Sequence, residues 1–267
     1  RNTEVKRIVV EDGKVSYVET ADGSKVHGKN FISNMHPVRT LDMTESNLIK
    51  QAYKHRVKSL ENSIGGFVVN IVFEKNTYPY IKNNFYYIKD GQEWNLTEYN
   101  DETWPSCYAV FCSASSKSPD YAESMTLLAY MKFDEVKQWA GTFNTVSKEE
   151  DRGKDYEAFK KIKAEKLLSL VEERFPGVRK AIKSYYTATP LSYRDYIGND
   201  DGSMYGIAKD YSNPLKTFIS PRTKIPNLYL TGQNLNLHGI LGATMSGLVT
   251  SVAFLGSEDI IEKIRNA

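Results

Sequence analysis

The stretch that most constrains this chain lies near its end, at residues 226–256. It reads PNLYLTGQNLNLHGILGATMSGLVTSVAFLG, two apolar runs joined by a polar segment between glycines. The run 227–231 predicts a buried strand, Gly232 predicts a turn, and Gly239 predicts the start of a helix. The stretch therefore predicts a strand–turn–helix unit.

The predicted helix carries small side chains at steps of three and four, with further glycines beside them: Gly239, Gly242, Ala243, Ser246, Gly247 and Thr250. Such steps place small residues along one stripe of a helix. A stripe without bulk lets a large flat ligand or another backbone come close. The first amides of the helix lack intrahelical partners and suit an anion or an electron-rich ring edge.

This strand, turn and Gly-x-x-Gly-Ala-x-x-Ser-Gly helix resembles the C-terminal flavin-binding segment of amine-oxidase-type FAD oxidoreductases. Residues 227–233, NLYLTGQ, are especially similar to the phytoene desaturase, carotenoid isomerase and retinol saturase branch. The resemblance implies that Gly232 makes the tight turn and that Gln233 and Asn234 reach the ribityl–phosphate region of FAD. Family members usually have an acidic residue where this chain has Asn234, whose uncharged amide still hydrogen-bonds a hydroxyl group.

The resemblance also assigns roles at the start of the helix. Gly239, Ile240 and Leu241 would offer backbone N–H groups to the pyrimidine edge of the flavin, where donors stabilise negative charge on a reduced ring. His238 would lie close to the ring and donate a proton or tune the flavin, which makes it the candidate catalytic residue. The alternatives are ordinary turn and helix-start chemistry for the glycines and a structural role for His238.

Residues 4–33 predict an antiparallel β-meander. Strands are expected at 5–10, 15–20 and 25–33, with hairpin turns at Asp12-Gly13 and Asp22-Gly23. In the family a similar meander ends in a strand reading V-I-S-N, and Phe31-Ile32-Ser33-Asn34 is similar. The first strand of that meander places an apolar side chain on the adenine, at the position of Val5. The alternative for Val5 is a plain strand residue.

Between the two ends, the patterns predict a mixed or antiparallel sheet with helices. A helical pattern covers 41–61, strands are expected at 64–74, 85–88 and 108–111, and 124–131 fits a strand or a helix. Gly65 and Gly66 suggest a bulge or a ligand approach. A long helix is expected from a capping box at Ser147 and Glu150 to Pro176-Gly177.

A second part of the resemblance lies in the predicted loop at residues 191–206. Thr189-Pro190, followed by Gly202-Ser203-Met204-Tyr205-Gly206, is similar to the segment before the final flavin motif in phytoene desaturases and retinol saturases. In the family this segment lies beside the isoalloxazine and the substrate tunnel. The resemblance rests on motifs at residues 4–40 and 186–256, and on layout alone between them.

Composition excludes several other functions. The chain has 267 residues, 40% hydrophobic and 25% charged, and a net charge of +2, which argues against nucleic-acid binding. No apolar run reaches the roughly 20 residues of a spanning helix, and no His, Cys or carboxylate cluster has metal-ligand spacing. Cys107 and Cys112 point to opposite faces of a predicted strand and fit free thiols in a reducing compartment. We therefore expect a cytoplasmic protein without metal, and leave peripheral membrane contact open because polyenes reside in lipid.

A dinucleotide-binding protein of this class should begin with a strand–GxGxxG–helix segment, which this sequence lacks. The opening Arg1 also suggests the middle of a longer polypeptide. We therefore expect the C-terminal portion of a larger flavoprotein, with the missing N-terminal segment as its partner. Because the pyrophosphate would lack its glycine-rich cradle, this chain alone should bind FAD weakly or not at all and should be inactive.

Together these patterns predict an α+β fold. Residues 1–35 and 220–267 would form part of an FAD-binding domain, and residues 36–219 a substrate-binding domain on a mixed or antiparallel sheet. The expected activity is hydrogen transfer across a C–C bond of a long apolar, isoprenoid-like substrate, by desaturation, saturation or isomerisation. The alternatives are an amine-oxidase-type flavoenzyme acting on an amine, and a non-catalytic module that binds an apolar ligand.

Overall fold

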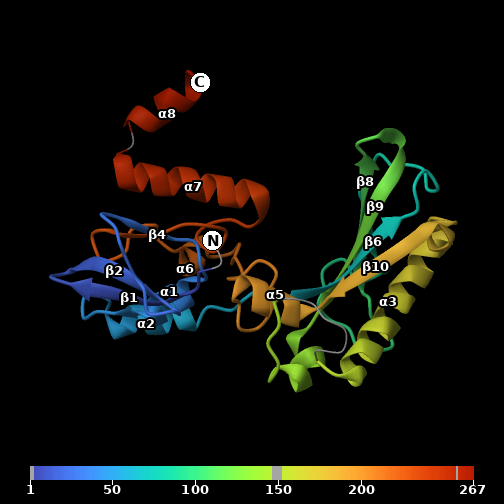
Figure 1. The fold of residues 1–267 in the computed structure, drawn as a ribbon, viewed down its shortest axis with the longest axis horizontal. Helices are drawn as coiled ribbons and strands as arrows, with labels where there is room; N and C mark the ends of the chain where they lie inside the picture. The colour runs from blue at the N-terminus through green and yellow to red at the C-terminus, as the bar shows by residue number, and fades with distance from the viewer. Residues whose placement is uncertain (1–2, 146–151, 257) are drawn as a thin grey trace. The chain divides into compact units, whose positions relative to one another are not determined.

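The computed structural model describes residues 3–145, 152–256 and 258–267 (Figure 1). The chain divides into two compact units, Arg1–Ser63 with Tyr205–Ala267, and Ile64–Met204. Both units combine helices with β-sheet, so the α+β class predicted from the sequence is confirmed. Among the described helices, none is long and apolar enough to cross a membrane.

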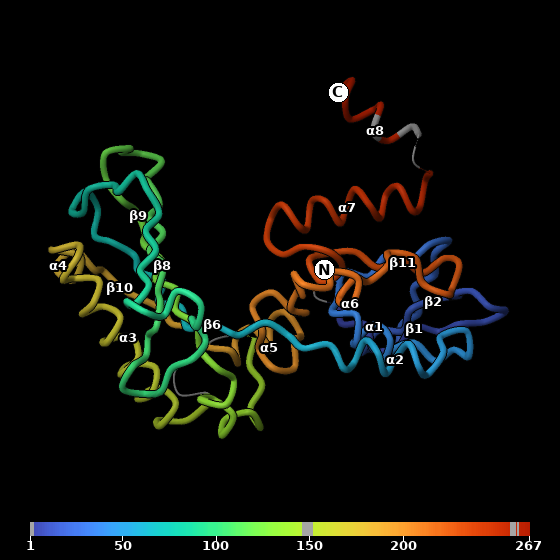
Figure 2. The backbone as a smooth tube through the Cα atoms, turned by 180° about the vertical axis from the view of Figure 1, so that it is seen from behind, coloured from blue at the N-terminus to red at the C-terminus, as the bar shows by residue number. Residues whose placement is uncertain are grey.

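The first unit contains the two ends of the chain. Its elements are β1 (Val5–Glu11), β2 (Lys14–Thr20), β3 (Lys25–His27), β4 (Phe31–Ser33), α1 (Pro37–Met43), β5 (Thr44–Glu45), α2 (Gln51–Lys58), α6 (Pro214–Thr217), β11 (Leu228–Leu230), α7 (Gly239–Leu255) and α8 (Glu258–Arg265). One sheet has the strand order β3-β2-β1-β5, and β4 pairs with β11 in a separate two-stranded sheet. In Figures 1 and 2, α7 runs alongside this two-stranded sheet.

The meander is confirmed, but its third strand differs from the expectation. The segment 25–33 forms two short strands, because the chain turns away after β3 and places the Phe31 ring over Gly28. β3 continues the antiparallel meander, whereas β4 pairs in parallel with β11, with Phe31 opposite Leu228 and Ser33 opposite Leu230. The tail of the chain therefore packs directly against the end of the meander.

The helical pattern expected over 41–61 is interrupted in the structure. α1 begins earlier, at Pro37, where the buried His36 caps it by accepting the Val38 N–H at Nδ1 (3.3 Å). After α1, Thr44 and Glu45 pair in parallel with β1 as β5, and α2 forms only afterwards. Pairing with an existing strand thus overrides the local helical periodicity here.

The second unit is built on a five-stranded antiparallel sheet of order β10-β6-β9-β8-β7. Its elements are β6 (Gly65–Phe73), β7 (Phe85–Ile88), β8 (Cys107–Ser115), β9 (Ser118–Met131), the 3-10 helix η1 (Phe133–Trp139), α3 (Lys154–Arg174), α4 (Val178–Ala181), β10 (Ile182–Ala188) and α5 (Pro190–Ile197). The ambiguous segment 124–131 is therefore a strand. Cys107 and Cys112 are both free thiols on β8, as expected.

The core of this unit lies between the sheet and α3, which covers one sheet face in Figure 1. Phe67, Val69 and Ile71 alternate along β6 and are buried, as are Leu167 and Val171 on α3. The alternation follows from the two-residue period of a strand, which sends every second side chain to the same face. The opposite face of β6 carries residues such as the exposed Asn70.

Gly65 and Gly66 do not form a bulge, because both pair in regular register with β9. They do mark a close approach, but the neighbour is protein. A Cβ on Gly65 would lie 2.8 Å from the Gly202 carbonyl oxygen, and one on Gly66 would lie 2.9 Å from the Met204 sulfur. The two glycines therefore admit the 202–204 segment against the head of β6.

Helices α3 and α5 lie before and after β10 in the chain. The capping box at Ser147 and Glu150 lies outside the described residues, and α3 begins at Lys154. Residues 191–206 were expected to be a loop, but α5 occupies their first half. Thr189 caps α5 by accepting the Leu191 N–H at its hydroxyl group, and Pro190 is the first residue of the helix. Gly198 ends the helix in the left-handed region (φ 84°). These are standard helix start and stop signals.

Candidate functional site

The candidate site is the turn from β11 to α7, and Asn227 holds it in place. Its buried side chain accepts the Val15 N–H at Oδ1 (2.8 Å) and donates from Nδ2 to the Val15 carbonyl (2.9 Å). Nδ2 also donates to the Lys29 carbonyl (3.2 Å). One amide side chain therefore pairs with the backbone of the meander as a strand would, and it links residues 212 positions apart in the sequence.

The turn itself is made at Gly232, whose φ of 99° favours glycine. The Gly232 N–H donates to Ser246 Oγ (3.0 Å) on α7, and Thr250 Oγ1 donates to the Leu230 carbonyl (3.0 Å) on β11. Two hydroxyl groups on α7 therefore hydrogen-bond the backbone of β11 and of the turn that follows it.

The small-residue stripe is only partly as expected. Gly242, Ser246 and Thr250, four residues apart, are buried and form the stripe that meets β11 and its turn, whereas Gly239 and Ala243 are exposed. The buried stripe is occupied by this chain's own backbone. At the N-terminal end of the stripe, a Cβ on Gly242 would overlap the Leu237 carbonyl group.

The start of α7 is open. The N–H groups of Gly239, Ile240 and Leu241 have no hydrogen-bond partner among the described residues, and the first intrahelical bond runs from Gly242 N to the His238 carbonyl (3.3 Å). The side chains do not cover these amides, since Ile240 is 90% exposed and Leu241 is 70% exposed. Three such donors at the positive end of a 17-residue helix suit an anion or an electron-rich ring edge.

His238 lies beside this open start, in a defined protonation state. Its Nε2 lies 2.7 Å from the Ile207 carbonyl, which can only accept, so Nε2 carries the hydrogen. Its ring stacks on Tyr205, with centroids 5.4 Å apart. Burial lowers the pKa of His238; the bond to Ile207 opposes this, and the charge of Lys209 adds to it. His238 is therefore neutral near pH 7, and its Nδ1 can accept a proton but has none to donate.

Asn234 is directed inward. It is 6% exposed, and its Oδ1 accepts the Ile207 N–H (3.0 Å). This contact depends on Gly206, where φ is 70° and a Cβ would overlap the Asn234 side chain. In this conformation the side-chain oxygen serves the chain's own backbone. Contacts from Gln233 and Asn234 to a cofactor stay a prediction.

Lys209 is a residue that the sequence analysis missed. Its Nζ donates to the carbonyl oxygens of Asn234 (2.8 Å) and Leu235 (3.4 Å), which fixes the loop between β11 and α7. Burial lowers the pKa of Lys209 to about 8. No local pattern marks this residue, because its partners lie 25 and 26 positions away.

Val5 lines a cavity of about 280 Å³ next to the β4–β11 pair. Ile8 and Val18 contribute to the same wall from the meander, and Ser33 and Asn34 from the end of β4. The proposed contact of Val5 with an adenine stays a prediction, although its position on a largely apolar wall suits a flat ring. Within the described residues, no group of His, Cys, Asp or Glu could hold a metal ion.

Comparison with known proteins identifies relatives, although no family model matches the chain. The all-trans-retinol 13,14-reductase of Rattus norvegicus is 30% identical over 153 residues, which cover 53% of this chain and 24% of the reductase. The human reductase is 29% identical over 154 residues, with 54% and 24% covered. The chloroplastic prolycopene isomerase of Daucus carota is 24% identical over 252 residues, which cover 92% of this chain and 38% of the isomerase. The matches thus span about a quarter to two fifths of the relatives' lengths.

The fold is shared with a solved oxidoreductase from Methanosarcina mazei. The TM-score is 0.53 at 16% identity, over 94% of this chain and 49% of that one. Together with the sequence relatives, this confirms the resemblance drawn from the motifs at both ends of the chain. The chain is a homologue of the retinol reductases and of prolycopene isomerase, in agreement with its resemblance to the phytoene desaturase and retinol saturase branch.

Proposed function

We propose that this chain is the C-terminal part of a longer FAD-dependent oxidoreductase that transfers hydrogen at a C–C bond of a long apolar, isoprenoid-like substrate. The observation that carries the proposal is the open start of α7, where three amides have no partner among the described residues, a few positions after the β11 turn. The relatives support the substrate class, since their names give all-trans-retinol and prolycopene, which are apolar polyenes.

The residues present fit part of an FAD molecule. The amides of Gly239, Ile240 and Leu241 would face the pyrimidine edge of the flavin, and the cavity at Val5 would take the adenine. When bound, FAD supplies the redox chemistry. The chain contributes the positive end of α7, which stabilises negative charge at that edge. His238, neutral and unprotonated at Nδ1, is suited to accept a proton there or to position the helix start.

The proposal includes a partner segment from the same polypeptide. α7 exposes a row of apolar side chains, among them Ile240, Leu241, Met245 and Leu255. Exposed apolar surface of this kind is typical of a contact with another element. We assign this contact to an N-terminal strand–GxGxxG–helix segment, which would also supply the cradle for the pyrophosphate. The cofactor-binding segments would lie in the first unit, and the substrate-binding domain would be built on the sheet of the second.

The first experiment measures flavin retention. The 267-residue chain and a longer chain that includes a GxGxxG segment are each mixed with FAD and separated by gel filtration. We expect flavin absorbance to co-elute with the longer chain and weakly or not at all with the shorter one. A longer chain that retains no flavin would contradict the proposal.

A pair of variants in the longer chain then tests the amides themselves. Ile240→Pro removes one N–H at a first-turn position where proline is tolerated, and it follows Gly239, which is not right-handed helical (φ 73°). Ile240→Ala removes the same side chain but keeps the amide. We expect the proline variant to bind FAD about tenfold more weakly than the alanine variant. Equal affinities of the two variants would show that the Ile240 amide does not contact the flavin. In the unaltered longer chain, reduction of bound flavin by an amine would favour the amine-oxidase alternative.

A further inference from the structure

The second unit contains a groove at the junction of β10 and α5. Two cavities of about 280 and 290 Å³ adjoin there, because Ala188, Ser192 and Tyr196 line both of them. These residues come from the end of β10 and from α5. We call the two cavities together the β10–α5 groove.

The two ends of the groove differ in chemistry. Val68 and Ile197 line one end, together with the Asn70 amide, so that end is mainly apolar. Arg152 and Lys160 line the other end. A ligand that fills both ends must therefore combine an apolar body with a polar head.

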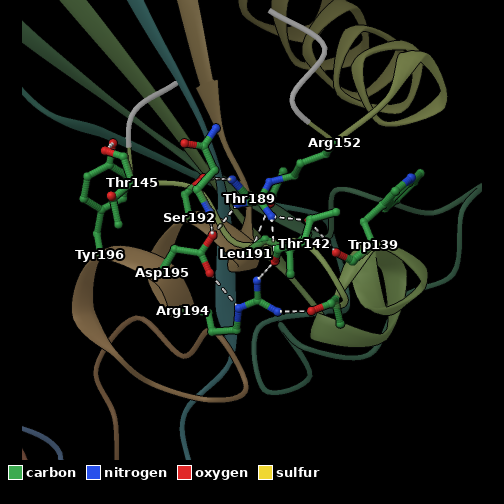
Figure 3. Close-up of polar contacts among 12 residues, drawn as sticks. Trp139, Thr142, Thr145, Arg152, Thr189, Leu191, Ser192, Arg194, Asp195 and Tyr196 are labelled. Atoms are coloured by element: carbon green, nitrogen blue, oxygen red, sulfur yellow. Dashed lines mark hydrogen bonds and ion pairs between the residues drawn. The ribbon is translucent and has the colours of Figure 1, made fainter. Parts of the chain in front are cut away.

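The charged end is built around Asp195, whose side chain has no exposed surface. Arg152 and Arg194 both pair with it, Arg194 at 2.7 Å through Nε, and the Asn144 N–H donates to it at 2.8 Å. Figure 3 shows both guanidinium groups directed at this carboxylate. Burial by itself raises the pKa of Asp195, but the hydrogen bonds from the two arginines and Asn144 outweigh it and lower the pKa. Arg152, only 6% exposed, is thus held at the wall of the groove.

The charges around this end do not balance. Two cations, Arg152 and Lys160, and one carboxylate, Glu157, line it, which leaves one positive charge among the described lining residues. The groove also adjoins the first turns of the 21-residue helix α3, whose N-terminal end is positive. A ligand with a single negative charge complements this surface.

Tyr156 positions the two cations that face the groove. Its ring lies 4.8 Å from the Lys160 ammonium and 5.5 Å from the Arg152 guanidinium, measured to the ring centroid. Its hydroxyl group bonds Thr189 Oγ1 at 2.8 Å, at the start of α5. The cations are therefore held on a shared aromatic wall, with Lys160 also 2.8 Å from Glu157.

We propose that the β10–α5 groove binds an amphipathic monocarboxylate, with the carboxylate at Arg152 and Lys160 and the apolar chain toward Val68 and Ile197. The inference deepens the proposed function, since it rests on an apolar ligand in the second unit and adds an anionic head to it. Carboxylates pair well with guanidinium and ammonium donors in partly buried sites.

The test titrates the 267-residue chain, without flavin, with parinaric acid, a polyene fatty acid whose fluorescence rises in an apolar site. Its methyl ester serves as the uncharged probe. Lys160→Met removes a charge at the groove, and Lys161→Met removes the same charge at the next, exposed position, outside the groove. We expect Lys160→Met to weaken acid binding about tenfold and to leave ester binding unchanged. Lys161→Met should change neither, and Ile197→Ser should weaken both probes.

Equal binding of the acid by the Lys160→Met variant and the unaltered chain would overturn the proposal, as would the absence of saturable binding of the acid. The measurement contains no flavin, so it can fail while the longer chain still retains FAD. Conversely, a longer chain that retains no FAD leaves the fatty-acid result standing. The two proposals are therefore tested separately.

Discussion

Two glycines on α7 allow a controlled test of the helix-start geometry. Gly242 lies where a Cβ would overlap the Leu237 carbonyl oxygen, and within 2.9 Å of Leu237 Cβ. Gly247, five residues further along the same helix, has no neighbouring atom within 4 Å of its Cβ position. Gly→Ala in a helix interior gains about 1 kcal/mol from propensity. Both substitutions therefore gain the same free energy from helix propensity, and they differ mainly in the contact with Leu237.

The two substitutions should differ in effect: Gly247→Ala should be stabilising, and Gly242→Ala neutral or destabilising. Gly247→Ala should stabilise the chain by about 1 kcal/mol. Gly242→Ala gains the same amount but must displace backbone, and overpacking of this kind costs about 1–3 kcal/mol. Its free energy of unfolding should thus lie about 1–3 kcal/mol below that of Gly247→Ala. In the longer chain, Gly242→Ala should also weaken FAD binding, because the displaced segment leads into the open amides.

Urea unfolding followed by far-UV circular dichroism measures the difference. Tryptophan fluorescence provides an internal reference, since all three tryptophans, Trp94, Trp104 and Trp139, lie in the second unit. Equal shifts of the midpoint by both variants would refute the placement of the Leu237 carbonyl against Gly242. It would also remove the stated reason why this position on α7 requires glycine.

Two further predictions concern the same unit. Asn227→Ala removes the side chain that pairs with the buried N–H and C=O of Val15, and it should lower the free energy of unfolding by about 2–4 kcal/mol. Asn30→Ala, at an exposed position, is the control. Similar losses of stability in both variants would contradict the role of Asn227 in linking the tail to the meander. His238, whose pKa is lowered from 6.5, should contribute stability that is lost as pH falls below 6.5, because the unfolded chain then binds the proton more readily. The stability difference between the unaltered chain and His238→Gln should therefore shrink or reverse toward acid, and a pH-independent difference would contradict this.

Much of the architecture was predictable because its signals are local. The strand–turn–helix at the tail follows from an apolar run, Gly232 and Gly239, and β6 and the meander follow from similar runs between turn residues. α5 was also predictable in principle. Its cap, proline and terminal glycine are standard local signals, although the segment was predicted to be a loop.

Other features depended on contacts between distant residues. Nothing near Phe31 indicates that β4 leaves the meander to pair with β11, and nothing near Thr44 indicates a strand inside a helical pattern. The same holds for Lys209, which reaches the loop before α7, and for Arg152, which meets Asp195 only when α5 packs beside the start of α3.

The sequence by itself thus determined most of the elements, the resemblance that the relatives confirm, and the polypeptide segment that carries the open amides. The tertiary structure decided where Asn234 points, which protonation state His238 adopts, and which charges gather at the β10–α5 groove. The physical reason is the range of the interactions. Turn and helix signals act within a few residues, whereas a buried hydrogen bond or ion pair forms only when the whole fold brings its two partners together and excludes water from them.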